Sequence, residues 1–363
     1  MEKMGTINRR SFAVLVTFFM TGTSILITPS GLAISAKQDA WVACLIGIGM
    51  NLATGLLYVL LGQRLGGQTL VQFCESTLGK WLGKAVSAGF VLFFYLLASL
   101  MVGDLGYFVT SQIMQETPME VLQMLFMIVV VMAVRSGFIV YTRAALVFFP
   151  WLLLLFLVLI VPLAPKFQFR NFMPFLEYGF KPVLHGAFTF WSLQELIVML
   201  MFYPLVAGAS VRRNGFATGI LIGGAILLLT TIGSIAVLGQ KLTANQLFPA
   251  YTLAKNISIG HFLERVEGIM ISIWVLSIFL KIVLTFHAAL IGFVQLLNLK
   301  SEKPLIAPLA LGMIVLSLMC YPNTIYVNDY LGKNWGPFSS MFTLFLPLAL
   351  YGISMIAGRL RNK

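Results

Sequence analysis

Long runs of apolar residues, separated by short polar connections, dominate the sequence. Ten of these runs approach or exceed the roughly 20 residues that an α-helix needs to cross a bilayer. They cover residues 12–34, 39–62, 85–112, 118–136, 141–164, 183–206, 214–239, 267–297, 304–321 and 337–358. The pattern predicts an all-α polytopic membrane protein with about ten transmembrane helices. No connection is long enough for a soluble domain, so residues 1–363 are expected to form a single membrane domain.

The connections and span ends carry features of their own. The polar connection 63–84 is weakly amphipathic and is expected to lie along the membrane surface. The connection 240–266 is also polar and is expected to contain a short helix. Tryptophan near the end of a span is typical of an anchor at the membrane interface. This interpretation applies to Trp41, Trp81, Trp151 and Trp335.

The first apolar run is interrupted near its middle. Residues 21–24 read Thr-Gly-Thr-Ser, and Pro29 follows five positions later. Glycine, proline and hydroxyl residues disfavour an α-helix, and an unpaired backbone amide inside a bilayer costs several kcal/mol. Two interpretations are open: a kinked helix packed through small residues, or an unwound substrate site of the kind found in secondary transporters.

Composition confirms the membrane class. The chain is 59% hydrophobic and only 10% charged, whereas soluble domains carry about 25% charged residues. The first run is too long for a cleavable signal peptide and no small-residue cleavage site follows it. The three scattered cysteines indicate neither a disulfide framework nor a metal site, and no cofactor is expected. Without a nucleophile–base pair or a metal cluster, the sequence does not indicate an enzyme.

The net charge of +12 does not indicate nucleic-acid binding, because the basic residues lie between the apolar runs instead of clustering. With the N-terminus inside, 15 of the 24 lysines and arginines lie on the inner side and 8 on the outer side, and Lys281 lies within a span. An excess of basic residues marks the cytoplasmic side. Both termini are therefore expected to be cytoplasmic.

Ten spans divide into an inverted 5+5 repeat, because a half with an odd number of spans reverses the orientation of the next half. The repeats are expected at about 12–164 and 183–358, which makes the sixth span the counterpart of the first. The sixth span is also interrupted, by the run Thr189-Phe190-Trp191-Ser192, by Gln194-Glu195 and by Pro204. Corresponding interruptions in two halves favour a transporter-type site at the midplane of the membrane.

The N-terminus of a half-helix presents free N–H groups and partial positive charge, which suit a carboxylate. The amides of residues 22–25 are therefore expected to hold the carboxylate of an amino acid, and the sixth span its ammonium group. The predicted ligand-binding residues are Thr21, Gly22, Thr23, Ser24, Ile25, Phe190, Trp191 and Glu195.

Three charged residues lie inside spans: Asp104, Glu195 and Lys281. An unpaired charge at the bilayer centre costs a few kcal/mol, so each is expected to face the interior and to have a partner. One interpretation is a structural ion pair of Lys281 with Glu195 or Asp104. The other makes Glu195 a ligand-binding or proton-carrying group and Lys281 a fixed cation in place of sodium. For Asp104, which lies nearer the outer end of its span, a position at the interface is a further alternative.

The histidines give no metal site. His287 lies six residues after Lys281 and therefore on another helix face, so the two are not expected to pair. His185 and His261 are expected at the outer rim, and none of the three has a second ligand at metal-binding spacing.

Five motifs, in this order and spacing, resemble the B subunits of the endospore nutrient-germinant receptors, a branch of the amino acid–polyamine–organocation transporter superfamily. They cover nearly the whole chain. They are Thr21-Gly22-Thr23-Ser24-Ile25-Leu26-Ile27-Thr28-Pro29 followed by Asp39-Ala40-Trp41; Leu78-Gly79-Lys80-Trp81-Leu82-Gly83; Asn171-Phe172-Met173-Pro174 continuing to Glu177-Tyr178-Gly179-Phe180-Lys181-Pro182; Phe262-Leu263-Glu264-Arg265-Val266-Glu267 with Trp274; and Asp329-Tyr330-Leu331-Gly332.

The resemblance implies a fold of the leucine-transporter type, with a ligand site between spans 1, 3, 6 and 8. It also implies a complex with an A subunit and a C-subunit lipoprotein in the inner spore membrane. The expected function is sensing of a small nutrient, such as L-alanine or another small amino acid, to trigger germination. Thr23 and Ser24 depart from the second Gly or Ala that is usual in the superfamily, so the resemblance does not specify the ligand.

Three functional classes fit these observations. The first is a receptor subunit in which ligand binding shifts the conformation. The second is an active amino-acid permease that moves its substrate by alternating access. The third is a structural anchor that has lost the site. The fold serves the first two and cannot choose between them. Bulky residues filling the break would favour the third class, whereas Gly22, Thr23 and Ser24 leave room for a ligand.

Overall fold

The computed structural model describes residues 6–255, 267–321 and 331–361. Two of the motifs above lie partly outside these ranges, at residues 262–266 and 329–330, and so does His261. The α-helices are α1 (Arg9–Thr21), α2 (Ser24–Ala36), α3 (Ala40–Arg64), α4 (Leu70–Leu78), α5 (Lys80–Gln112), α6 (Met119–Ser136), α7 (Phe138–Ile160), α8 (Phe180–Ser192), α9 (Ala209–Asn245), α10 (Pro249–Lys255), α11 (Glu267–Leu296), α12 (Lys303–Cys320), α14 (Gly336–Ser340) and α15 (Leu346–Arg361).

Short 3-10 and π-helical segments join several of these helices. The 3-10 segments are η1 (Lys37–Asp39), η2 (Val161–Lys166), η3 (Phe169–Phe172), η4 (Leu196–Met201) and η5 (Tyr203–Leu205), and the π-helical ones are η7 (Leu331–Trp335) and η8 (Met341–Phe345). An isolated backbone bridge between Ile7 and Val206 adds a contact that is not helical.

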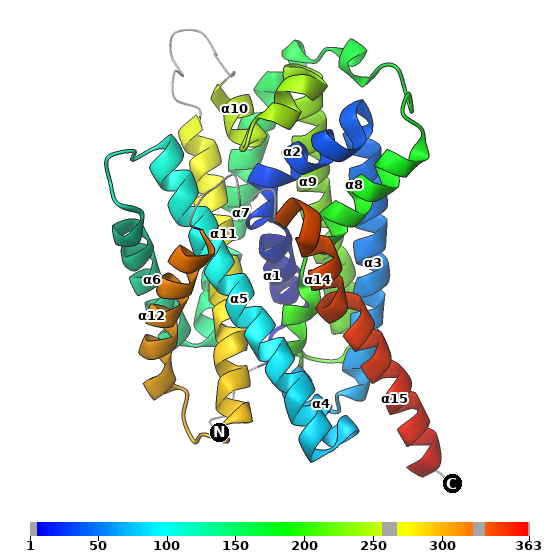
Figure 1. The fold of residues 1–363 in the computed structure, drawn as a ribbon, viewed down its shortest axis with the longest axis vertical. Helices are drawn as coiled ribbons and strands as arrows, with labels where there is room; N and C mark the ends of the chain where they lie inside the picture. Colours follow the sequence, from blue (N-terminus) through cyan, green and yellow to red (C-terminus); the bar gives the residue numbers. More distant parts are fainter. Residues whose placement is uncertain (1–5, 256–266, 322–330, 362–363) are drawn as a thin grey trace.

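The ten predicted spans correspond to helices or to pairs of half-helices in Figure 1. Nine helical stretches within the described residues are long and apolar enough to cross a membrane, and one of them, Ser24–Arg64, joins α2, η1 and α3. The remaining segment, α1, has 13 residues and is too short to cross alone. It forms the first predicted span together with α2. The all-helical membrane architecture is thereby confirmed for the described residues.

Two of the connections between spans contain a short helix, which the sequence predicts for only one of them. The connection between α3 and α5 contains α4, which begins with a reciprocal capping box between Thr69 and Gln72. Helix α10 lies inside the connection 240–266, so the expected short helix is confirmed. The seventh span is longer than predicted: α9 extends to Asn245, across a non-helical Gly239 with φ 76° and ψ 164°.

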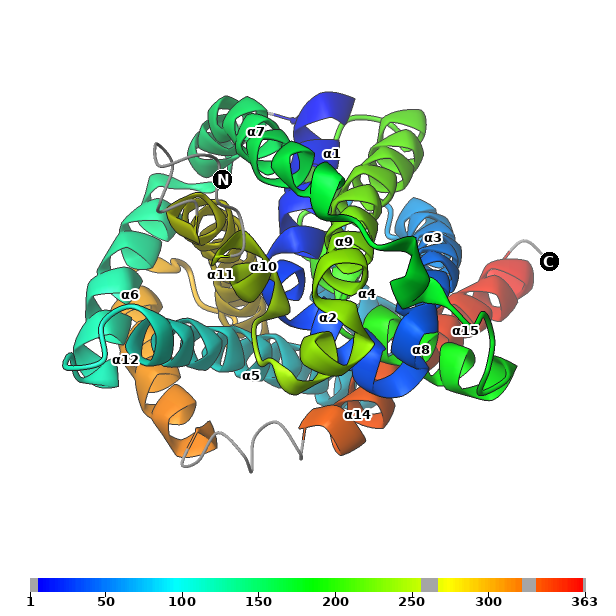
Figure 2. The same ribbon diagram turned by 90° about the horizontal axis from the view of Figure 1, so that it is seen from above.

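Helix α1 is the buried centre of the bundle. Every residue from Ser11 to Thr21 is buried, whereas α6, α12 and α15 lie at the periphery in both ribbon views (Figures 1 and 2). Close packing of α1 on α9 depends on glycines at every fourth position of α9. A Cβ atom on Gly215, Gly219 or Gly223 would lie within 2.5–2.8 Å of Phe12, Val16 or Met20. Such small residues let membrane helices approach closely.

The start of the first span is tied to the end of the sixth. The amide of Ile7 donates to the carbonyl oxygen of Leu205 at 2.8 Å, and the amide of Ala207 donates to the carbonyl oxygen of Ile7 at 3.1 Å. The Arg212 guanidinium lies 4.4 Å from the ring centre of Tyr203, whose hydroxyl donates to Val59 O. The Ile7 hydrogen bonds join the two broken spans at one end of the bundle, and the contacts of Tyr203 join the sixth span to α9 and α3.

The α1–α9 packing predicts a pair of glycine substitutions with opposite effects. In Gly219→Ala the new Cβ would lie 2.5 Å from Val16 Cβ and 2.7 Å from the Ala13 carbonyl oxygen. Overpacking of this kind costs about 1–3 kcal/mol, so we expect a lower midpoint of thermal unfolding in detergent. Gly352→Ala on α15 has no atom within 4 Å of the new Cβ and is expected to unfold at the same or a slightly higher temperature, because alanine favours a helix. Equal midpoints for the two variants would contradict this packing.

Candidate functional site

The break in the first span is a two-residue interruption of the helix. Helix α1 ends at Thr21, and Gly22 has φ −18° and ψ −104°, outside the helical region. The amide of Gly22 still donates to Phe18 O at 2.9 Å, so this amide is not available to a ligand. Helix α2 begins at Ser24, and the first amides of a helix have no intrahelical acceptor. The predicted break is confirmed. Of the amides of residues 22–25 that are expected to hold an anion, only those of residues 23–25 remain candidates.

Position 22 must be glycine, because the side chain of Lys281 packs directly against its backbone. A Cβ atom at this position would lie 2.5 Å from Cδ and 2.9 Å from Cβ of Lys281 on α11. The break thus serves two purposes: it frees the first turn of α2, and it allows the aliphatic stem of a buried lysine to pass directly over the backbone.

The sixth span breaks at the matching place. Helix α8 ends at Ser192, Glu195 has φ −32° and ψ 51°, and the chain continues as the 3-10 segment η4. The two breaks touch, because the side-chain amide of Gln194 donates to Ser24 Oγ at 3.0 Å. The predicted pairing of interruptions in spans 1 and 6 is therefore confirmed.

Lys281 joins the two breaks electrostatically. Its Nζ lies 3.2 Å from Glu195 Oε2, and it donates to Thr23 Oγ1 and to the carbonyl oxygen of Leu193 at 3.4 Å each. The side chains of Lys281 and Glu195 are only 1% and 2% exposed. Of the two ion pairs that the sequence left open for Lys281, the structure contains the one with Glu195. These additional hydrogen bonds offset the free-energy cost of removing the two charges from water.

The second carboxylate oxygen of Glu195 has a partner that the sequence did not reveal. The indole N–H of Trp335 donates to Glu195 Oε1 at 3.1 Å, and Ser339 Oγ donates to Ser192 O at 3.1 Å. Trp335 is 8% exposed and its ring stacks on Phe93 with centroids 6.1 Å apart. The prediction of an interfacial anchor at Trp335 is wrong, because η7 and α14 re-enter the bundle and carry this side chain to the site. Trp81 and Trp151, by contrast, are 88% and 58% exposed.

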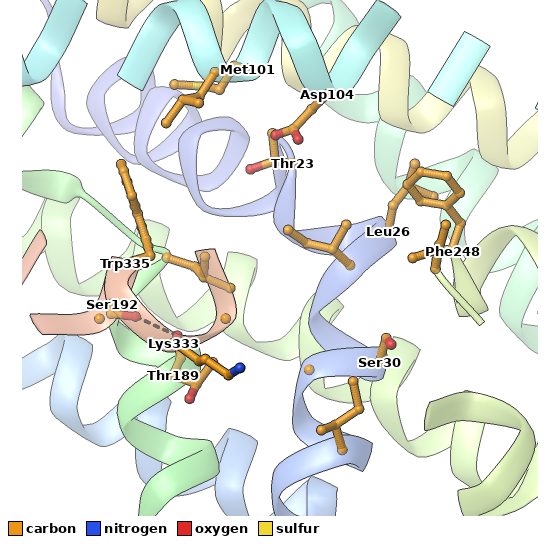
Figure 3. Close-up of a pocket in the computed structure, with 18 of the residues that line it drawn as sticks. Thr23, Leu26, Ser30, Met101, Asp104, Thr189, Ser192, Phe248, Lys333 and Trp335 are labelled. Carbon is orange, nitrogen blue, oxygen red and sulfur yellow. Dashed lines mark hydrogen bonds between the residues drawn. The ribbon is translucent and has the colours of Figure 1, made fainter. Parts of the chain in front are cut away.

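A cavity of about 410 Å³ lies beside this ion pair (Figure 3). This volume is within the range of small-molecule sites. Its walls come from the first, third, sixth and eighth spans, as the resemblance implied. Residues 244–248, at the end of α9 and before α10, Tyr321 after α12 and the start of the tenth span complete them. The polar and charged lining residues are Thr23, Ser30, Asp104, Tyr107, His185, Thr189, Ser192, Glu195, Asn245, Gln246, Lys281, Tyr321 and Lys333. The larger apolar ones include Leu26, Leu97, Leu100, Met101, Phe188, Phe248, Trp274 and Trp335.

Four of the predicted site residues line this cavity: Thr23, Asp104, Glu195 and Lys281. The others form its support. Thr21 and Ser24 hydrogen-bond to Phe18 O and Gln194, and Gly22 and Ile25 are packed inside the break. Phe190 and Trp191 point instead toward α3, where Phe190 packs on Gly47 and Trp191 Nε1 donates to Thr54 Oγ1 at 3.3 Å.

Two further polar groups complete the description. Asp104 lines the cavity rather than the interface, and the Tyr321 hydroxyl donates to its Oδ1. His287 does not pair with Lys281: it shares a 2.7 Å hydrogen bond with the Tyr141 hydroxyl and lies 3.7 Å from Glu302. The interaction with His287 lowers the pKa of the Glu302 carboxyl below its usual value.

Two solved structures share this architecture. MhsT in complex with L-phenylalanine has a TM-score of 0.72 at 14% identity, covering 94% of this chain and 89% of that chain. A substrate-bound outward-open state of a Na⁺-coupled sialic acid symporter has a TM-score of 0.61 at 12% identity, covering 97% of this chain and 78% of that chain. The chain is thus a multi-pass membrane protein with the predicted leucine-transporter-type fold.

Sequence similarity defines the family. Residues 6–325 match the family described as "Spore germination protein". The chain is 30% identical to Spore germination protein KB of Bacillus subtilis (strain 168) over 373 aligned positions, which cover all of this chain and 98% of that protein. It is 22% identical to Spore germination protein B2 of the same organism, over 94% of each chain. The chain belongs to the spore germination protein family, which confirms the predicted resemblance.

The buried pair predicts a specific pattern of stability changes. Lys281→Met leaves Glu195 without its cation, and removing one partner of a buried pair costs about 3–5 kcal/mol. We therefore expect a strongly lowered unfolding temperature, and a similar loss for Glu195→Ala. The double variant Lys281→Met/Glu195→Gln removes both charges and is expected to regain most of the wild-type stability. If the loss in the double variant instead equals the sum of the losses in Lys281→Met and in Glu195→Gln measured alone, the two residues act independently and the pairing is contradicted.

Proposed function

We propose that this chain is the nutrient-binding membrane subunit of a spore germinant receptor and that its ligand is a small amino acid. The observation that carries the proposal is the cavity between the two helix breaks, where Thr23 of the first break and Glu195 of the sixth span are joined by Lys281. The relatives named for spore germination and the neighbour bound to L-phenylalanine support the same assignment.

The chemistry of the cavity suits an amphipathic zwitterion. The amides at the start of α2 provide donors and partial positive charge for a carboxylate. The acidic lining residues provide acceptors for an ammonium group, and Leu26, Met101 and Phe248 provide an apolar wall for a side chain. Residues 21–25 together with Phe190, Trp191 and Glu195 remain our proposed ligand-site region, in which those outside the lining position the ones within it.

Lys281 replaces a mobile coupling ion in this proposal. Its ammonium group contacts a hydroxyl, a backbone carbonyl and a carboxylate contributed by both breaks, and these are oxygen ligands of the kind that hold a cation. Because the cation is covalently part of the chain, ligand binding is expected not to require sodium.

Membership of the spore germination protein family supports a proposal for partners and location. We propose that the chain assembles with A and C subunits of a germinant receptor in the inner spore membrane, with both termini cytoplasmic. The excess of basic residues on the side of the termini supports this orientation, as does the contact of α15 with α3 and α4 at one end of the bundle. We also propose repeats at 12–164 and 183–358 and a non-enzymatic role.

An active permease is the second candidate, and the similarity of the fold to MhsT and to a symporter favours it. A permease must open the cavity to both sides in turn. The six residues of η4, which follow Glu195 in the sixth span, are all buried. Beyond them, the backbone bridge between Ile7 and Val206 joins the first and sixth spans. The structure therefore has one closed end, and net accumulation across a bilayer is the property that distinguishes the two candidates.

A cavity-blocking variant tests the proposed ligand site. Leu100 of α5 lines the cavity, so Leu100→Trp is expected to fill it and to abolish stabilisation by every amino acid that stabilises the wild type. The probes are glycine, L-alanine, L-valine, L-leucine and L-phenylalanine, and the measurement is the shift in unfolding temperature of the purified chain in nanodiscs. The matched control is Leu92→Trp on the same helix, where the side chain is 58% exposed.

Leu92→Trp is expected to keep the wild-type shifts. The proposal is contradicted if Leu100→Trp is folded and still stabilised by the same amino acids as the wild type, because those amino acids then bind elsewhere.

A further inference from the structure

Asp104 is an acidic residue of the cavity without a cationic partner in the described part of the chain. Among the described residues, its side chain accepts a hydrogen bond from the Tyr321 hydroxyl at Oδ1. Within residues 6–255, 267–321 and 331–361, the ion pairs at 4.0 Å or less are Lys281–Glu195 and His287–Glu302. Asp104 takes part in neither, although it lies on a membrane-spanning helix, where an uncompensated charge costs a few kcal/mol.

The basic groups of the cavity either have other partners or lie on the wall opposite Asp104. The ammonium group of Lys281 is held between Glu195, Thr23 and the carbonyl of Leu193. Lys333 lies on the opposite wall, in the region of Thr189 and Ser192 (Figure 3). His185 belongs to α8, which forms that same wall. Within the described residues, the cavity therefore presents one carboxyl group, that of Asp104, that forms no ion pair, and Lys281 acts on it only at longer range.

The carboxyl group of Asp104 lies beside the N-terminus of α2 (Figure 3). Figure 3 shows the carboxyl group of Asp104 on the same side of the cavity as Thr23, immediately before the first turn of α2. A site for an anion, made by helix amides, and a site for a cation, made by a carboxylate, thus occupy one end of the cavity. The two charged groups of an α-amino acid are attached to the same carbon and need such an arrangement.

We propose that Asp104 binds the α-ammonium group of the amino acid and that Tyr321, by holding Oδ1, orients the carboxylate toward it. The inference rests on the proposed function and deepens it, because it makes Asp104 the residue that selects α-amino acids over carboxylic acids without an amino group. The side chain of the bound amino acid then extends along Leu26, Met101 and Phe248, away from the charged end.

Asp104→Asn tests this assignment, because asparagine keeps the shape and still accepts the Tyr321 hydrogen bond at Oδ1 but has no charge. The dissociation constants of L-alanine and L-lactate, which differ in an ammonium and a hydroxyl group, are measured on the purified chain in nanodiscs together with the four other amino acids used above. Hydrogen bonds to charged groups are among the strongest in proteins. We expect the wild type to prefer L-alanine by about tenfold or more, and Asp104→Asn to lose that preference.

Three controls separate recognition from folding. Asp104→Glu keeps the charge and is expected to retain the preference for the amino acid. Tyr321→Phe removes only the orienting hydroxyl and is expected to weaken binding by about threefold. Glu116→Gln removes an acid of the same charge at an exposed position and is expected to bind like the wild type. Because Asp104→Asn removes an uncompensated charge, its unfolding temperature is expected to be unchanged or higher.

The outcomes distinguish this inference from the function on which it rests. If Asp104→Asn keeps the preference for L-alanine while Leu100→Trp abolishes binding, the assignment of Asp104 is overturned and the ligand cavity stands. If Asp104→Asn instead unfolds at a lower temperature and Asp104→Glu also loses the preference, the carboxylate is structural and the assignment is overturned. If none of the five amino acids binds to the wild type, both proposals are overturned.

Discussion

The ion pair between Lys281 and Glu195 is the interaction on which the rest of the site depends. A lysine and a glutamate that are almost completely buried in a membrane domain are stable only together, and only if the surrounding oxygens and N–H groups complete their hydrogen bonds. The structure meets this requirement with parts of both broken spans: Thr23, the carbonyl of Leu193 and the indole of Trp335. Three consequences follow. Residue 22 must be glycine, the first and sixth spans must break opposite each other, and the tenth span must return to the core.

These constraints explain how one architecture can serve sensing as well as transport. A ligand that binds at the cavity touches the same breaks that Lys281 joins, so its binding free energy can shift the relative positions of spans 1, 6 and 8. A ligand shifts a conformational equilibrium only as far as its affinities for the two states differ. The Trp335–Glu195 hydrogen bond connects the site to the start of the tenth span, whose helix α15 extends to the edge of the bundle (Figure 1).

Much of this arrangement was predictable from the sequence. Apolar run lengths indicated the spans, and the Thr-Gly-Thr-Ser and Gln194-Glu195 interruptions indicated the two breaks, because both signals are local. The partner of Lys281 could be narrowed only to two acids, since pairing depends on how distant helices pack. Trp335 was assigned to the interface, because its position near a span end does not reveal that η7 and α14 turn inward. Phe190 and Trp191 were expected in the ligand site, but which face of α8 meets the cavity is set by packing on α3.

Uptake of labelled L-alanine into proteoliposomes that contain the purified chain, with and without a proton gradient, tests the central claim most directly. The claim is that this transporter-like fold holds its ligand in a single cavity and senses it without moving it across the membrane. It predicts a fast plateau at about one L-alanine per chain that the gradient does not raise. Accumulation well beyond that ratio, increased by the gradient, would contradict the account and make the chain a working permease.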